Sequence, residues 1–166
     1  ISFSGEEEGL QGSAYYVSQL PQEERERIVG DVQIDMVGHY QSKEIMLKTT
    51  DGQPTLVGNL INQQAAALLG APLRTETEAA SDHMSFVRGQ IPAVLVEQDN
   101  LGVENHRFSY QPSIIVPDKV VPLAQVLKAM LEQVMSSDSG SFAAEARTVT
   151  QVAESVYTFT DETILF

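Results

Sequence analysis

The amino-acid sequence predicts a layered α/β domain. Along the first 135 residues, short segments with the composition of β-strands alternate with segments of helical periodicity, an order that places helices on the faces of a sheet. The chain has 166 residues, which is the length of one domain with its own core. Hydrophobic residues make up 42% of the chain and charged residues 20%, a composition that is typical of globular proteins and not of disordered ones.

Four segments have strand patterns. Residues 1–4 alternate between apolar and polar side chains and are followed by Gly5, and residues 29–37 and 91–97 are mainly apolar runs. The third is followed by the pair Asp51-Gly52, which favours a turn. The expected strands are residues 1–4, 29–37, 44–49 and 91–97.

Five segments have helical signals. Apolar residues recur at helical spacing between residues 55 and 69, and Gly70 follows them as a stop signal. Ser81 or Asp82 is the expected cap of a shorter helix. Residues 22–27 are so highly charged that a solvated turn fits them as well as a short helix. The expected helices are residues 14–20, 22–27, 55–69, 81–88 and 122–135.

The end of the chain differs from the rest. Residues 136–141 read Ser-Ser-Asp-Ser-Gly-Ser, which is typical of a flexible linker. Residues 142–166 hold one modest helix candidate and an apolar end. We therefore expect one domain over residues 1–135, a linker over 136–141 and a C-terminal tail over 142–166.

The composition argues against several classes of function. The chain carries 23 acidic and 10 basic side chains, a net charge of -13, so we expect no nucleic-acid partner, because a phosphate backbone needs a basic surface. No apolar run is long enough to cross a bilayer, so we expect no membrane insertion. The absence of cysteine excludes a thiolate nucleophile and a cysteine-ligated zinc. The sequence also lacks the Gly-rich phosphate-binding motifs, the Gly-x-Ser-x-Gly elbow and the His-Glu-x-x-His zinc signature.

Two acidic motifs follow predicted strands. Glu6, Glu7 and Glu8 fit either a solvated turn favoured by a helix N-terminus or a metal site in which one carboxylate binds the ion and its neighbour is the general base. Asp35 ends an apolar strand, where a carboxylate is either a hydrogen-bonded cap or a ligand. Both motifs fall at the carboxyl ends of strands, where α/β sheets bind ligands. Of the three histidines, His39, His83 and His106, each taken alone is more often structural than ligating.

Four ordered segments carry a family resemblance. Residues 5–13 read Gly-Glu-Glu-Glu-Gly-Leu-Gln-Gly-Ser, and residues 34–38 read Ile-Asp-Met-Val-Gly. Residues 81–93 join a Ser-Asp-His block to Gly-Gln-Ile-Pro-Ala, and His106 follows at the place of a last histidine ligand. Together these segments resemble the zinc-dependent aminopeptidases, whose relatives include glutamate carboxypeptidase, the transferrin-receptor ectodomain and glutaminyl cyclase. The resemblance covers about residues 1–135.

The resemblance implies a fold and a chemistry. The fold is a three-layer α/β/α domain with a mixed, mostly parallel sheet, here N-terminally truncated. Glu6 would be the general base and Glu7 and His106 would bind one zinc ion. Asp35 would bind the second of the two zinc ions that an intact catalytic domain holds. The implied substrate is a peptide with a free N-terminus, and the implied location is secreted or periplasmic.

The same resemblance assigns weaker roles to three other residues. Asp82 and His83 look like structural or substrate-side residues of their block. Family members commonly have Tyr before the last histidine, whereas this chain has Asn105, so Tyr110 is the remaining candidate for a donor to the oxyanion.

The chain also departs from the family pattern. The family's first histidine ligand and its metal-bridging aspartate lie upstream of the Glu-Glu turn, and this sequence contains neither. We therefore expect the C-terminal part of a catalytic domain, inactive alone, with exposed sheet edges that favour self-association. The alternatives are a non-catalytic, peptidase-like binding or receptor module and a single-zinc glutaminyl cyclase.

Overall fold

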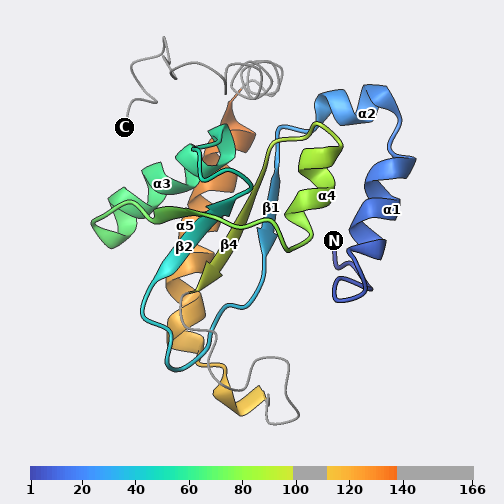
Figure 1. Cartoon of the computed structure of the whole chain (residues 1–166). Helices are drawn as coiled ribbons and strands as arrows, with labels where there is room; N and C mark the ends of the chain where they lie inside the picture. The colour runs from blue at the N-terminus through green and yellow to red at the C-terminus, as the bar shows by residue number, and fades with distance from the viewer. Residues whose placement is uncertain (99–111, 138–166) are drawn as a thin grey trace.

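The computed structural model describes residues 1–98 and 112–137, and the chain in these ranges forms a small sheet with helices packed on it (Figure 1). The helices are α1 (Gln11–Gln19), α2 (Gln22–Arg27), α3 (Leu56–Leu69), α4 (His83–Arg88) and α5 (Pro117–Ser136), with a 3-10 turn, η1, at Pro112–Ile114. The strands are β1 (Asp31–Ile34), β2 (Ile45–Thr49), β3 (Arg74–Thr77) and β4 (Ala93–Gln98).

The sheet is mixed, as predicted. Its strand order is β1-β4-β2-β3. β1 runs parallel to β4 and β2 runs parallel to β3, whereas β2 and β4 are antiparallel. Because β1 and β4 are parallel neighbours, their carboxyl ends lie at the same end of the sheet.

Helices cover both faces of the sheet, which confirms the three-layer α/β/α prediction. Figure 1 shows α3 and α5 on one side and α1 and α4 on the other. The larger core lies under α3 and α5, where side chains of both helices pack against β2 and β4. A smaller cluster on the other face joins Val17 of α1 and Phe86 of α4 to Ala93 of β4. The hydroxyl groups of Ser13 and Ser85, both buried, are hydrogen-bonded at 2.8 Å and fix α1 against α4.

The ends of α3 follow from its sequence. The Thr55 side chain accepts a hydrogen bond from the Gly58 backbone N–H at 3.0 Å, which caps the first turn. Gly70 ends the helix with φ of 86°, in the left-handed region that favours glycine. The sequence located both ends of this helix.

The secondary structure differs from the prediction at three places. Residues 1–4 form no strand, because no strand of the described chain lies beside them; the Ser4 carbonyl instead accepts from the Gly12 backbone N–H at 2.9 Å. β3 was missed because Arg-Thr-Glu-Thr has no apolar residue to mark it. α5 begins at Pro117 and not at residue 122, because Pro117 takes the first position and Pro122 lies inside the helix.

Two further predictions concern the C-terminal tail and membrane insertion. The predicted linker and tail lie outside the described residues, apart from Ser136 and Ser137. In residues 1–98 and 112–137, no helix is both long and apolar enough to cross a membrane.

Candidate active site

A cleft of about 650 Å³ opens where β1 ends. Its walls come from the N-terminal segment, the end of β1, the loop between β3 and α4, and β4. No basic residue or histidine of the described chain lines it. Six acidic residues do: Glu6, Glu7, Asp35, Glu78, Asp82 and Glu97.

The structure therefore brings together four of the seven predicted site residues. Glu6, Glu7, Asp35 and Asp82 come from three separate segments and line the same cleft. His83 lies one residue further on, at the start of α4. His106 and Tyr110 lie outside the described residues.

The Glu6–Glu8 segment is a tight turn folded back on the chain before it. The Glu6 carbonyl accepts from the backbone N–H groups of Gly9 and Leu10 at 3.1 and 2.9 Å. The turn needs close backbone approach at Gly12, where a Cβ atom would lie 2.5 Å from the Ser4 carbonyl oxygen. The result is that Glu6 and Glu7 line the cleft, whereas Glu8 is exposed outside it.

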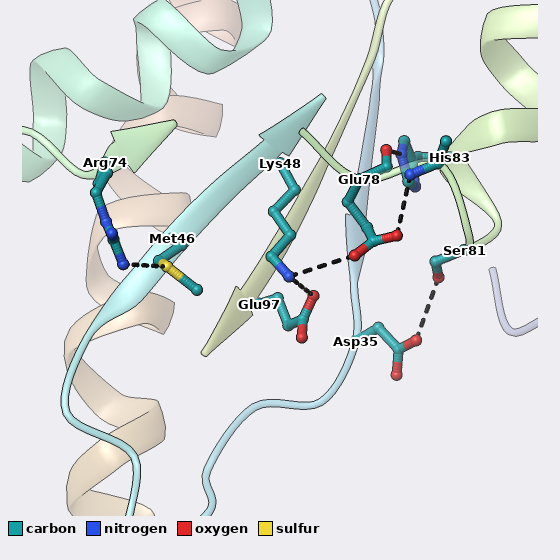
Figure 2. Close-up of polar contacts among 9 residues, drawn as sticks. Asp35, Met46, Lys48, Arg74, Glu78, Ser81, His83 and Glu97 are labelled. Atoms are coloured by element: carbon teal, nitrogen blue, oxygen red, sulfur yellow. Dashed lines mark hydrogen bonds and ion pairs between the residues drawn. The ribbon is translucent and has the colours of Figure 1, made fainter. Parts of the chain in front are cut away.

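Asp35 directly follows β1 and extends its pairing with β4. Its backbone N–H donates to the Val96 carbonyl at 3.2 Å. Its carboxylate accepts a hydrogen bond from the Ser81 hydroxyl at 3.2 Å, as Figure 2 shows. The carboxylate is thus held between the end of β1 and the loop before α4.

The neighbouring Asp82 and His83 are buried. His83 is fully enclosed; its Nε2 donates to the Glu78 carbonyl at 2.9 Å, and this bond holds the loop between β3 and α4 (Figure 2). Burial lowers the pKa of His83, which keeps the ring neutral at pH 7. Asp82 is 4% exposed, and its Oδ1 has no hydrogen-bond partner among the described residues.

Sequence reasoning missed the ion pairs that join two lining residues of the cleft, Glu78 and Glu97, to Lys48. Lys48 Nζ lies 2.9 Å from Glu97 Oε2 and 3.6 Å from Glu78 Oε2 (Figure 2). Burial alone would lower the pKa of Lys48, but the hydrogen bond to Glu97 and the charges of Glu97 and Glu78 outweigh that effect and raise it. A lysine near the end of one apolar strand and a glutamate near the end of another are the signals that could have revealed the pair.

Sequence reasoning also missed Asp31, the first residue of β1. Burial and the nearby charge of Asp82 raise the pKa of Asp31 to about 7. Its Oδ2 atom is buried without a hydrogen-bond partner among the described residues. The signal in the sequence was an acidic residue between Val29-Gly30 and Val32, inside an apolar run.

The donor set of the cleft can be compared with the needs of zinc. Carboxylate oxygens, which Glu7 and Asp35 bring to the cleft, are among the atoms that bind zinc in proteins, and a catalytic zinc usually has three protein ligands. Within residues 1–98 and 112–137, no group of three His, Cys, Asp or Glu side chains is arranged to hold a metal ion. The donor chemistry therefore fits zinc, but the described residues supply an incomplete set.

A family model matches the chain, and so do curated proteins. The model of peptidase family M28 matches residues 1–131. Leupeptin-inactivating enzyme 1 of Streptomyces exfoliatus is 33% identical over 90 residues, which are 54% of this chain and 20% of that protein. Aminopeptidase YwaD of Bacillus subtilis (strain 168) is 36% identical over 89 residues, 52% of this chain and 19% of that protein. The chain thus spans about a fifth of the length of these relatives.

Solved structures share the fold. An aminopeptidase from Aneurinibacillus sp. strain AM-1 superposes with a TM-score of 0.75 and 30% identity, over 79% of this chain and 32% of that one. BSAP, a zinc aminopeptidase from Bacillus subtilis, superposes with a TM-score of 0.76 and 21% identity, over 84% of this chain and 37% of that one. These findings confirm the resemblance on which the sequence prediction rested.

Proposed function

The chain belongs to peptidase family M28, and from this premise we propose that it forms part of the active site of a zinc aminopeptidase that removes N-terminal residues from peptides. One observation carries the proposal: Glu6 and Glu7 from one segment and Asp35 from another line a single cleft at the end of β1. A solvated turn or a simple helix cap would not require these side chains to converge.

The proposed roles follow from position and chemistry. Glu6 is the general base that takes a proton from the attacking water. Glu7 and His106 hold one zinc ion and Asp35 holds the other. Bound zinc supplies an activated water and stabilises negative charge on the substrate carbonyl oxygen. Ser81 orients the Asp35 carboxylate through its hydroxyl hydrogen bond of 3.2 Å.

The remaining groups of the cleft suit a substrate with a free N-terminus. An ammonium group is attracted by carboxylates, and the lining described above is acidic without a basic residue. Asp82 and His83 support the wall of the cleft, and Tyr110 is the proposed donor to the oxyanion. A peptide with an uncharged, acylated N-terminus should therefore be a poor substrate.

Zinc binding to the 166-residue chain tests the ligand assignment. The chain contains three proposed ligands, Glu7, Asp35 and His106, so we expect measurable binding that is weaker than that of a complete site. Glu7→Gln and Asp35→Asn should each weaken binding by more than about tenfold in a competition titration with a zinc-sensitive dye, because loss of a ligand costs at least as much as loss of a group that orients one. Glu8→Gln is the matched control, because Glu8 is adjacent in sequence but exposed outside the cleft.

Two outcomes would contradict the proposal. If Glu7→Gln and Asp35→Asn bind zinc as tightly as the unchanged chain, these residues are not ligands. If Glu8→Gln weakens binding as much as Glu7→Gln, the effect is only one of net charge.

The number of zinc ions bound by the protein with a complete ligand set separates the proposed two-zinc peptidase from a single-zinc cyclase. A metal-free protein would favour a binding module. The 166-residue chain alone should release no product from an aminoacyl p-nitroanilide, and chelator-sensitive release would refute that expectation.

A further inference from the structure

The turn that follows Asp35 has an unusual backbone. Met36 has φ of 51° and Gly38 has φ of 95°, so two of its residues adopt left-handed conformations. Methionine rarely adopts this region, and such conformations persist only where the surrounding structure fixes them. A Cβ atom at Gly38 would lie 2.8 Å from side-chain carbons of Ile115 and Val120, so the turn packs closely against the start of α5.

Gln98, the last residue of β4, contacts this turn directly. It is 3% exposed, and its Oε1 accepts a hydrogen bond from the backbone N–H of Gly38. Its Nε2 donates to the Lys119 carbonyl in α5 at 3.1 Å. The side-chain amide thus joins the turn to α5, and both its oxygen and its nitrogen have partners.

β4 therefore holds the turn at both of its ends. The carbonyl of Val96 accepts from the Asp35 N–H at 3.2 Å, and the side chain of Gln98 accepts from the Gly38 N–H. A second backbone bond, from the Val116 N–H to the Gly38 carbonyl at 2.7 Å, ties the same residue to the chain before α5. Between these points the backbone has little freedom to move the Asp35 side chain.

Gln98 acts from the face of the sheet opposite the cleft. Val94 and Val96 belong to the core under α3 and α5, whereas Leu95 and Glu97 line the cleft. Because side chains alternate along a strand, Gln98 lies on the α5 side, as its bond to Lys119 shows. Gln98 has no contact with a substrate from that position, so any role it has is exerted through the backbone.

We infer that Gln98 is a positioning residue that sets where the Asp35 carboxylate lies in the cleft, by holding the turn over residues 35–38. This inference rests on the proposed role of Asp35 as a zinc ligand. Ser81 fixes the carboxylate itself, and Gln98 fixes the backbone that carries it. Loss of a group that orients a ligand typically lowers metal affinity ten- to a hundredfold.

The test uses the 166-residue chain with Zn²⁺ alone as the probe. Gln98→Met keeps the length of the side chain but removes its amide, and it should weaken zinc binding about tenfold. Amide hydrogen exchange, followed by NMR without metal, should lose protection at Gly38 in this variant. Gln64→Met is the matched control, because Gln64 also makes an amide–amide bond, 2.7 Å to Gln133, but between α3 and α5 and away from the cleft. It should lower stability without changing zinc affinity.

The outcomes separate this inference from the proposed function. If Asp35→Asn leaves zinc binding unchanged, the proposed function fails. If Asp35→Asn weakens binding but Gln98→Met stays within about twofold of the unchanged chain, only the role of Gln98 is refuted. If Gln98→Met does not fold, Gln98→Glu decides, because burial favours its protonated carboxyl group, which can accept from the Gly38 N–H and donate to the Lys119 carbonyl as the amide does. It should bind zinc within about threefold of the unchanged chain, and a tenfold loss would overturn the inference.

Discussion

The two faces of the sheet use the same strands for different purposes. On the face covered by α3 and α5, the strands contribute mainly apolar side chains to the large core, with Gln98 as a buried polar exception. On the cleft face, the same strands present charged groups: Lys48 alternates with Leu47 along β2, and Glu97 alternates with Val96 along β4. The apolar face stabilises the fold, and the cleft face carries the groups that can do chemistry.

The cleft face also lowers the stability of the fold. Oxygen atoms of Asp31 and Asp82 and the Nδ1 atom of His83 are buried without hydrogen-bond partners among the described residues. Each such atom lowers the free energy of unfolding, because it has lost its hydrogen bonds to water without forming new ones within the described chain. Functional sites commonly contain such destabilising groups, and the packing of the rest of the fold compensates for them. The comparison between the faces can therefore be tested by measuring stability.

The largest effect should come from pH, through Asp31. Its carboxyl group has an ordinary pKa of 3.8, which burial and Asp82 raise to about 7 in the folded chain. Between these values the folded state binds more protons than the unfolded state, so the free energy of unfolding falls as pH rises from 4 to 7 and then levels off. A shift of about three pKa units corresponds to a fall of roughly 4 kcal/mol.

Asp31→Asn removes this titration. Urea unfolding at pH 4.5, 6 and 8 should show a much flatter profile for the variant than for the unchanged chain, and a stability advantage that grows with pH. Asp118→Asn, at an exposed position in the first turn of α5, should keep the original slope. Parallel slopes for the unchanged chain and Asp31→Asn would mean that Asp31 is not the titrating group.

The next effect concerns the apolar face. Ile61 in α3 is 0% exposed within the large core. Ile61→Ala should lower the free energy of unfolding by about 3 kcal/mol, through lost burial and the cavity that remains. Leu68→Ala, on the same helix but 53% exposed, should change it far less. Chemical denaturation at a fixed pH measures both, and equal losses would show that α3 is not packed as described.

The sequence predicted the apolar face better than the cleft face. Helical periodicity between Thr55 and Gly70 specifies α3 and its contact with a core, because spacing and caps are local properties. The run 93–96 is apolar throughout, so the sequence could not say which of its residues face α5 and which face the cleft. β3 was missed because none of its residues is apolar, so no hydrophobic pattern marks it as a strand.

The sequence predicted those residues of the candidate site that belong to the family motifs. The resemblance singled out Glu6, Glu7, Asp35 and Asp82, and the structure places all four at one cleft. Partners that depend on strand register could not be seen: Lys48 meets Glu97 only because β2 and β4 pair antiparallel in one particular register. The pairing of Gln98 with Gly38 depends in the same way on where β1 ends relative to β4.

The smallest of the three effects should come from Lys48. Its ammonium group pairs with Glu97, which is almost fully buried, and with Glu78 on the loop between β3 and α4. Lys48→Met keeps the aliphatic part of the side chain but leaves the Glu97 carboxylate without its cation, so the free energy of unfolding should fall by about 2 kcal/mol. The raised pKa of Lys48 means that this contribution is fully present below the ordinary value of 10.5 and is lost only at higher pH. Lys128→Met, which removes an exposed ion pair with Glu132 on α5, should change stability little. Denaturation at pH 7.5 distinguishes the two lysines, and equal effects would mean that Glu97 is as well solvated as the surface of α5, which would remove the contrast between the faces.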